Sequence, residues 1–214
     1  MGNQLKKIFI RPTKRETVAA FITVLYLAFQ CYRTFIYPLP AMLLRPIHVA
    51  SVGILCALYV PFKTKDKSKL CQVAASVYDW FSYAAAVWIL IYHVTQYKRI
   101  VTRLAYLDAL YWYDIVTCIL VIALIVGGIL RTVGLPLAIF IGVAIAYGFF
   151  APYLPGILYY QGLNLGKFTE LMIMGNSGIY GSALSAASGF LFWMMLFGGL
   201  FSGGACGQVL IDIG

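Results

Sequence analysis

Residues 115–130 read IVTCILVIALIVGGIL, sixteen consecutive positions without a charged side chain. Apolar stretches of about 20 residues are the length that a helix needs to cross the hydrocarbon core of a bilayer. Asp114 and Arg131 stand directly on either side of the run. The stretch therefore predicts a membrane-spanning helix with polar residues at both ends.

Similar apolar segments lie on both sides of this one. Five further spans are expected at about 17–36, 46–62, 74–94, 135–150 and 184–201. The whole chain of 214 residues is 62% hydrophobic and 11% charged, whereas soluble domains are roughly 45–50% apolar and about 25% charged. These values predict an all-α integral membrane protein, a multi-span helical bundle whose solvent is the bilayer.

The basic residues accompany the spans. The net charge is +9. The lysines and arginines flank apolar runs and form no nucleic-acid-binding motif, so nucleic acid is not an expected partner. With the N-terminus inside, the inside segments hold ten Lys and Arg residues and the outside segments six. This bias favours a cytoplasmic N-terminus, although the basic loop around Lys98 argues against it. The polar N-terminal lead does not resemble a secretory signal.

The segment TQYKRIVTRLAYLDALYWYD, residues 95–114, has apolar residues at helical spacing. It is read either as a helix lying in the membrane interface or as an extension of the neighbouring spans. Asp79 and Asp114 fall at span ends and are expected to be interfacial, which leaves the spans essentially without charge. An intramembrane proton relay is therefore not expected.

Few residues suggest catalysis. His48 and His93 lie in separate spans, and no metal-protease or nucleophile-elbow motif is present. Each histidine is expected to be a satisfied polar contact, and the protein is not expected to be an enzyme. The five cysteines are odd in number and without C-x-x-C spacing, so neither a disulfide nor a metal site is expected.

Residues 175–190, GNSGIYGSALSAASGF, concentrate four glycines and four serines. Small residues allow close helix packing, but Asn176 and so many backbone breakers are not needed for packing. Non-helical backbone at membrane depth must be buried or line a polar cavity, and transporters bind ions and substrates at such interruptions. Composition leaves packing and a transport site equally open.

From Arg131 onward the chain resembles the fused permeases of TRAP transporters (tripartite ATP-independent periplasmic transporters) of the type associated with TAXI binding proteins. The resemblance is carried by RTVGLPLAIFIGVAIAYGFFAPYLPG and by GNSGIYGSALSAASGFLFWMMLFGGLFSGGACGQVLIDIG. LLRPIHVA and the first four spans resemble the small-subunit portion more loosely. This implies a four-span small-permease-like domain at 1–130, and at 131–214 the start of the large permease domain with its first re-entrant helical hairpin.

The resemblance also implies a function. It suggests a permease component in a bacterial inner membrane that moves an organic acid by an elevator-like motion coupled to sodium, with a periplasmic TAXI-type binding protein as partner. Carried over, it implies ion and substrate binding by Asn176, Ser177, Gly178, Ser182, Ser185 and Ser188. Sodium, the coupling ion, would be held by oxygens of Asn176, Ser177 and Ser182, and no other cofactor is expected.

A fused permease of this family needs about ten further spans, so the chain is expected to be an N-terminal portion that does not transport alone. The alternative is a non-transporting membrane scaffold that assembles with a larger permease chain. Substrate identity, sodium stoichiometry and oligomeric state are not predicted from these residues.

Overall fold

The structure is a computed structural model that describes residues 13–62 and 69–203, apart from the side chains at 69–72 and 74. Every regular element in these residues is a helix, as the composition predicts. The order is α2 (Lys14–Phe35), α3 (Ala41–Tyr59), α4 (Lys69–Thr95), α5 (Tyr97–Thr102), α6 (Trp112–Thr132), α7 (Leu135–Phe150), η1 (Ala151–Tyr153), η2 (Gly156–Leu158), α8 (Leu165–Thr169), η3 (Glu170–Met174), η4 (Gly178–Tyr180), α9 (Ser182–Ala186), η5 (Ala187–Leu191) and α10 (Phe192–Gly203).

Five stretches of the described chain are long and apolar enough to cross a membrane. They are Lys14–Phe35, Ala41–Tyr59, Trp112–Thr132, Leu135–Tyr153 and Ser182–Ser202. By length and composition they confirm a membrane protein and five of the six predicted spans. The predicted span at 74–94 is part of α4, which is not in this set. Side chains in the first turns of α4, at 69–72 and 74, lie outside the described residues, so this span stays a prediction.

Part of the predicted orientation rests on residues that are not placed. Lys6, Lys7, Arg11, Lys63, Lys65 and Lys67 lie outside the described residues, as do Cys206 and the closing stretch 204–214. The cytoplasmic N-terminus and the bacterial inner membrane therefore stay predictions.

Helix ends follow local chemistry. The amide of Thr13 donates to Glu16 Oε2 at 2.9 Å at the start of α2, and the amide of Tyr111 donates to Asp114 Oδ2 at 2.9 Å at the start of α6. Both are the backward half of a capping box, which satisfies an amide that has no partner inside the helix. Between α6 and α7, Gly134 turns the chain at φ +110°, a conformation that glycine adopts without strain.

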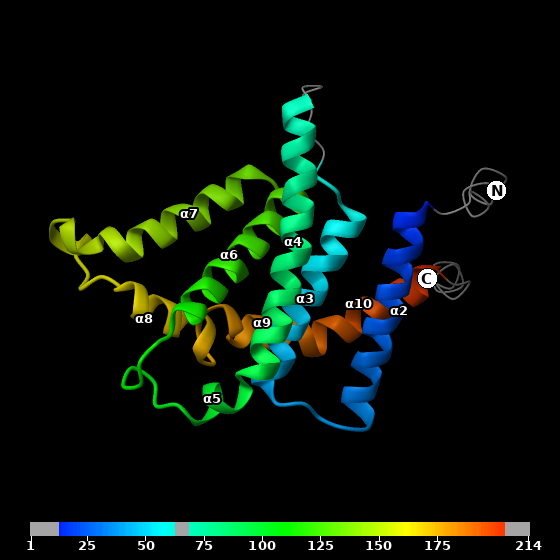
Figure 1. The fold of residues 1–214 in the computed structure, drawn as a ribbon, viewed down its shortest axis with the longest axis horizontal. Coiled ribbons are helices and arrows are strands. Elements are labelled where there is room, and N and C mark those ends of the chain that lie inside the picture. Colours follow the sequence, from blue (N-terminus) through cyan, green and yellow to red (C-terminus); the bar gives the residue numbers. More distant parts are fainter. Residues whose placement is uncertain (1–12, 63–68, 204–214) are drawn as a thin grey trace, which may run out of the picture.

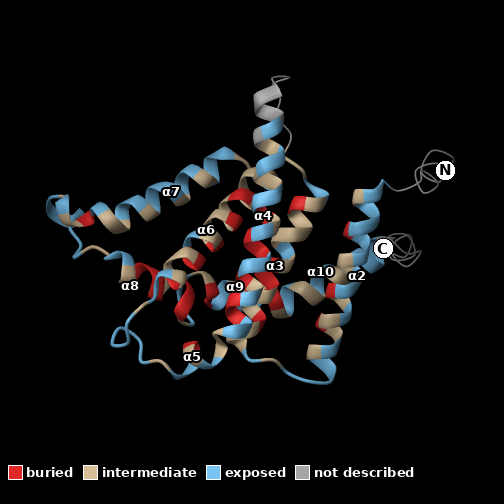
Figure 2. Ribbon diagram, in the orientation of Figure 1, coloured by how far each residue is buried: buried red, intermediate tan, exposed pale blue. Residues whose placement is uncertain are grey.

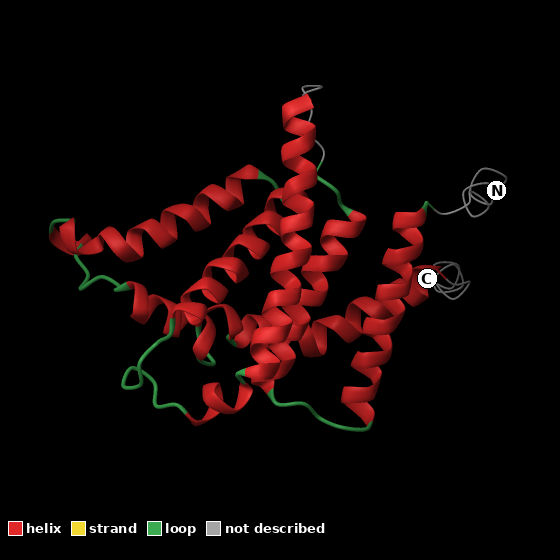
Figure 3. Cartoon of the chain, viewed as in Figure 1, coloured by secondary structure: helices red, strands yellow, loops and turns green. Residues whose placement is uncertain are grey.

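Helices α3, α4 and α6 all contact one another, and α2 packs against α3 (Figure 1). The segment from α8 to α10 runs across α3, which η4, α9 and η5 all contact. The loop after α2 and the loop after α5 both lie at the lower edge of the view in Figure 3. The contacts of η4, α9 and η5 with α3 place the interrupted segment against the first part of the chain.

The buried core lies where α3, α4, α6 and the segment from α8 to η4 meet, as the red residues of Figure 2 show. Ala50, Ile89, Val121, Ile173 and Tyr180 are among its least exposed members. The core therefore joins residues from both sides of position 130. By contrast, α7 contains no fully buried residue: Ile145 and Phe149 pack against the core, and Ile139, Phe140 and Val143 are exposed.

The predicted interfacial helix at 95–114 is only partly correct. α5 covers six residues and ends at Thr102, and the chain then continues without a helix to Tyr111. Asp108 draws the backbone out of the helix because its Oδ2 accepts from the amide of Leu104 at 2.8 Å. Tyr106 follows with φ 63°, an uncommon value for a residue other than glycine.

Candidate functional site

The glycine- and serine-rich stretch interrupts a helix. α8 continues as the π-helical turn η3 to Met174, the backbone leaves the helix at Gly175, and a continuous helical run begins at Ser182 with α9, η5 and α10. The non-helical stretch Gly175–Gly181, with the short turn η4 inside it, is called the break below. The interruption thus lies in the first half of the stretch 175–190 that the sequence singled out, and residues 182–190 are helical.

Gly178 fixes the shape of the break. It has φ +59°, and a Cβ built on it would lie 2.2 Å from the carbonyl oxygen of Leu171 and 2.8 Å from the Cα of Met172. Both neighbours are backbone atoms of the preceding helical turn, so they cannot rotate away as a side chain can. Only glycine fits this position, and the break packs directly against the end of η3.

The arms of the break lead in different directions. In Figure 1, α10 runs away from α8 toward α2. The ring of Phe192 lies 5.7 Å from that of Tyr26, and the ring of Trp193 lies 6.1 Å from that of Phe35, centroid to centroid. These contacts anchor α10 on α2, and the predicted re-entrant hairpin stays a prediction.

The predicted site residues separate into two groups. Five are exposed and belong to the break or to the start of α9: Asn176, Ser177, Gly178, Ser182 and Ser185. Ser188 is only 1% exposed and lies one turn further along, in the π-helical η5. Its hydroxyl donates to the carbonyl of Ser185 at 3.3 Å, so Ser188 is a buried member of the helix and is separate from the exposed group.

Arg45, in the first turns of α3, holds the break from the side. Its Nη1 donates to Oδ1 of Asn176 at 2.9 Å and also to the carbonyl of Tyr180. Tyr180 is 1% exposed, and its ring meets that of His93 edge-on with centroids 5.3 Å apart. The break is therefore fixed to α3 by a hydrogen bond and to α4 by a buried ring.

Arg33, near the end of α2, makes an equivalent contact further along. Its Nη2 donates to the carbonyl of Ser188 at 2.7 Å, and its Nε donates to Oε1 of Gln30 at 2.6 Å. A π-helical turn departs from the i to i−4 hydrogen-bond pattern of an α-helix. The carbonyl of Ser188 is therefore available to accept from Arg33. Gln30 also donates to the hydroxyl of Tyr26, which lies 2.5 Å from Nδ1 of His48.

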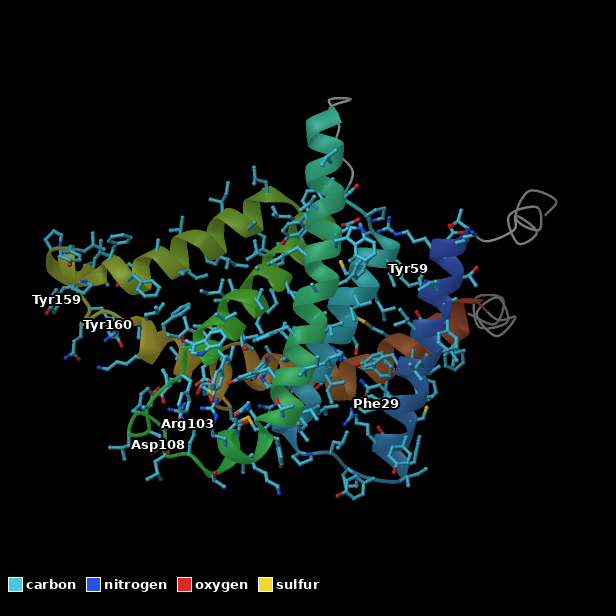
Figure 4. All side chains as sticks on the ribbon, viewed as in Figure 1. Phe29, Tyr59, Arg103, Asp108, Tyr159 and Tyr160 are labelled. Carbon is cyan, nitrogen blue, oxygen red and sulfur yellow. The ribbon has the colours of Figure 1, made fainter. Side chains whose placement is uncertain are left out.

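Arg103 holds the turn before the break. Its side chain is 6% exposed and pairs with Glu170, which is 7% exposed and also accepts from the amide of Tyr106 at 3.1 Å. Arg103 lies in the loop with Asp108 (Figure 4), and its Nη2 donates to the carbonyl of Asp108 at 2.8 Å. A cavity of about 130 Å³ lies between this loop and the break, and Ser177 is part of its wall.

Sequence reasoning missed these arginines as parts of the site. Each is a lone basic residue at a helix end or in a loop, the pattern that ordinary interfacial residues also show. Their partners are backbone carbonyls and residues at least 67 positions away.

Asp114 lies in the first turn of the candidate span α6, and the interfacial position expected for Asp79 and Asp114 stays a prediction, but both carboxylates are paired inside the protein, which the sequence did not indicate. Asp114 is 0% exposed; it pairs with Arg99 and accepts from the hydroxyl of Tyr92 at 2.5 Å. Asp79 lies within α4 and contacts Arg131 Nη1 at 2.9 Å and Arg15 Nη2 at 3.1 Å. Buried acids persist because each has a cationic partner, which a scan of single spans does not reveal.

Arg99 illustrates the balance in such a pair. Burial lowers the pKa of its guanidinium, but the hydrogen bond and the negative charge of Asp114 outweigh burial, so that the pKa is raised. Arg99 also lies over the rings of Tyr111 and Tyr113, each 5.1 Å from its Cζ to the ring centroid. The loop between α5 and α6 is thereby fixed by a charged pair and two cation–π contacts.

Both histidines make a polar contact, as expected, but one ring nitrogen of His93 does not. His48 bonds to Tyr26, and Nδ1 of His93 lies 2.9 Å from the carbonyl of Ile89. Nε2 of His93 is buried without a hydrogen-bond partner in the described structure. Three cysteines in this part of the chain, Cys31, Cys56 and Cys118, are free.

The described residues contain no group of three or more His, Cys, Asp or Glu side chains able to hold a metal. Comparisons with family models, with curated proteins and with solved structures find no match for this chain. The contacts around the break are consequently the basis for assigning its chemistry.

Proposed function

We propose that this chain is the membrane permease component, or part of it, of a sodium-coupled and binding-protein-dependent secondary transporter for organic acids, of the TRAP type that it resembles. The observation that carries the proposal is the break between two helical arms, set in a chain with five candidate spans. Interrupted helices of transporters leave carbonyls and helix ends free for ions and substrates. Non-helical backbone at membrane depth must be buried in protein or line a polar cavity.

Within this proposal, exposed oxygens near the break receive the sodium ion. The hydroxyls of Ser177 and Ser182 are exposed, and no hydrogen bond from either is found in the described part of the chain. Asn176 Oδ1 already accepts from Arg45, so a sodium ion on this oxygen must first displace an arginine. The serine hydroxyls and break carbonyls are therefore the oxygens that sodium reaches most easily.

Sodium-driven uptake tests the proposal. Radiolabelled short-chain mono- and dicarboxylates are supplied to cells that express the complete native polypeptide with its binding protein, with sodium or choline outside. Uptake is expected to require sodium, and Ser182→Ala is expected to raise the sodium concentration for half-maximal uptake about tenfold, the effect of losing about 1.4 kcal/mol of ion binding. Ser202→Ala, an exposed serine of α10, is the matched control. The mechanism is refuted if the uptake rate is the same with sodium as with choline and is unchanged by Ser182→Ala.

A second candidate is a non-transporting scaffold subunit. It is favoured by α7, whose apolar side chains have no buried position in the described structure, as on a helix that packs against another membrane chain. Purification of the native polypeptide in mild detergent, followed by intact mass measurement, separates the two candidates. A chain of about this size that copurifies with a larger permease supports the scaffold, and a single much longer polypeptide supports the transporter.

A further inference from the structure

We infer that Arg45 and Asn176 form a binding site for an oxyanion, meaning a carboxylate or a phosphate group, at the exposed side of the break. Only the role of that oxyanion as transported cargo rests on the proposed function; binding itself does not. The site joins α3 to the break, so it is built from two parts of the chain that are far apart in sequence. Its residues are held together by the hydrogen bond from Arg45 to Asn176.

The charge of Arg45 has no counter-charge in the described residues. Four of the arginines there, Arg15, Arg99, Arg103 and Arg131, contact a carboxylate within ion-pair distance. Arg45 instead donates to an amide oxygen and to a backbone carbonyl. An arginine in a candidate span is costly without an anionic partner. A bound anion would supply the negative charge that the described residues do not place beside Arg45. Arg33 also lacks an ion pair, but it donates to Gln30 and the buried Ser188.

Donors for an oxyanion remain free at Arg45 and beside it. Arg45 Nη1 makes both hydrogen bonds; within the described residues Nη2 makes none, and it is not among the buried atoms without a partner, whereas Nε is. Asn176 uses its oxygen toward Arg45, which leaves the Nδ2 amide donor on the other side of the same exposed side chain. A guanidinium nitrogen and a side-chain amide are donors that suit carboxylate and phosphate oxygens.

The donors are also held in place before any ligand arrives. Nη1 of Arg45 is anchored on the carbonyl of Tyr180, whose ring is buried. Gly178 fixes the course of the break against the end of η3. A site whose donors are already oriented loses less entropy when it binds. The same guanidinium repels a cation at Asn176 Oδ1, so this side of the break favours an anion.

The test measures binding without transport. The 214-residue chain is placed in phosphatidylcholine nanodiscs, and its thermal unfolding midpoint is measured with sodium acetate or sodium succinate against sodium chloride, at equal sodium concentration and ionic strength. At about ten times the dissociation constant, a bound carboxylate is expected to raise the midpoint by about 3 °C. The measurement is repeated in nanodiscs that contain phosphatidylglycerol, which supplies lipid phosphate with a net charge.

Arg45→Gln is expected to abolish the shift, whereas Lys98→Gln, which removes one exposed positive charge elsewhere, is expected to keep it. A shift with the free carboxylates identifies a soluble oxyanion as the ligand, and a shift only with phosphatidylglycerol identifies a lipid phosphate. Either result supports the site if it depends on Arg45. The absence of any shift, or an equal shift in Arg45→Gln, overturns it.

A second variant covers the case in which Arg45→Gln does not fold. Asn176→Asp places a carboxylate of the chain itself beside Arg45, so it is expected to raise the midpoint without ligand and to remove the response to added anions. An unchanged anion response in this variant overturns the site. If the anion response persists while sodium-driven uptake fails, the site stands and the transporter proposal falls. If uptake is observed without an anion response, the transporter proposal stands and the site falls.

Discussion

Replacing Asp114 with Asn is expected to lower the free energy of unfolding by about 3–5 kcal/mol, the cost of breaking one side of a buried charged pair. Asp114 is 0% exposed, and its carboxylate accepts hydrogen bonds from Arg99, Tyr92 and the amide of Tyr111. An asparagine keeps one oxygen and turns an NH₂ group toward the remaining donors. Unfolding by dodecyl sulfate in mixed micelles, followed by circular dichroism, measures the difference.

Two comparisons separate this effect from a general loss of charge. Asp108→Asn changes an exposed carboxylate whose Oδ2 bonds only to the nearby amide of Leu104 in the described structure, and it is expected to cost about 1 kcal/mol. Adding Arg99→Gln to Asp114→Asn is expected to recover part of the stability, because no uncompensated guanidinium then remains. Equal costs for Asp108→Asn and Asp114→Asn would show that the pair does not hold the loop in the way described.

Local composition was sufficient to predict the spans and the position of the break. Apolar runs specify membrane helices because lipid leaves the backbone no other partner than itself, and five predicted runs coincide with candidate spans. Glycines and serines at 175–190 marked the interruption because glycine adopts a φ such as the +59° of Gly178 without strain. These features depend on residues that are near each other in sequence.

The contacts that surround the break could not be predicted in the same way. Arg33, Arg45 and Arg103 reach acceptors on the segment from Glu170 to Ser188, and no spacing rule connects a lone arginine with a carbonyl so distant in sequence. The buried state of Asp114 was missed for the same reason, because its partner Arg99 belongs to another element. Whether a charged residue of a membrane protein is buried depends on its charged partner. That partner is identified only when the packing of the helices is known.

Gly178→Ala is expected to cost about 3 kcal/mol or more and to abolish sodium-driven uptake by the complete polypeptide. A left-handed conformation costs a residue with a Cβ about 1–2 kcal/mol, and the 2.2 Å approach to the carbonyl oxygen of Leu171 must also be relieved by moving backbone. Any such movement shifts Asn176 and Tyr180 relative to Arg45, which holds both. Dodecyl sulfate unfolding and uptake measured on the same variant report the two effects.

Gly189→Ala is the matched control, since a Cβ there meets nothing within 4 Å and the residue belongs to the helical run that follows the break. It is expected to be neutral, or to stabilise the helix by up to about 1 kcal/mol, because alanine is the better helix former. If Gly178→Ala unfolds as easily as Gly189→Ala does, the break is not fixed by its glycine. If Gly178→Ala loses stability but transports normally, the shape of the break serves folding alone, and its residues cannot be the place where sodium and substrate are coupled.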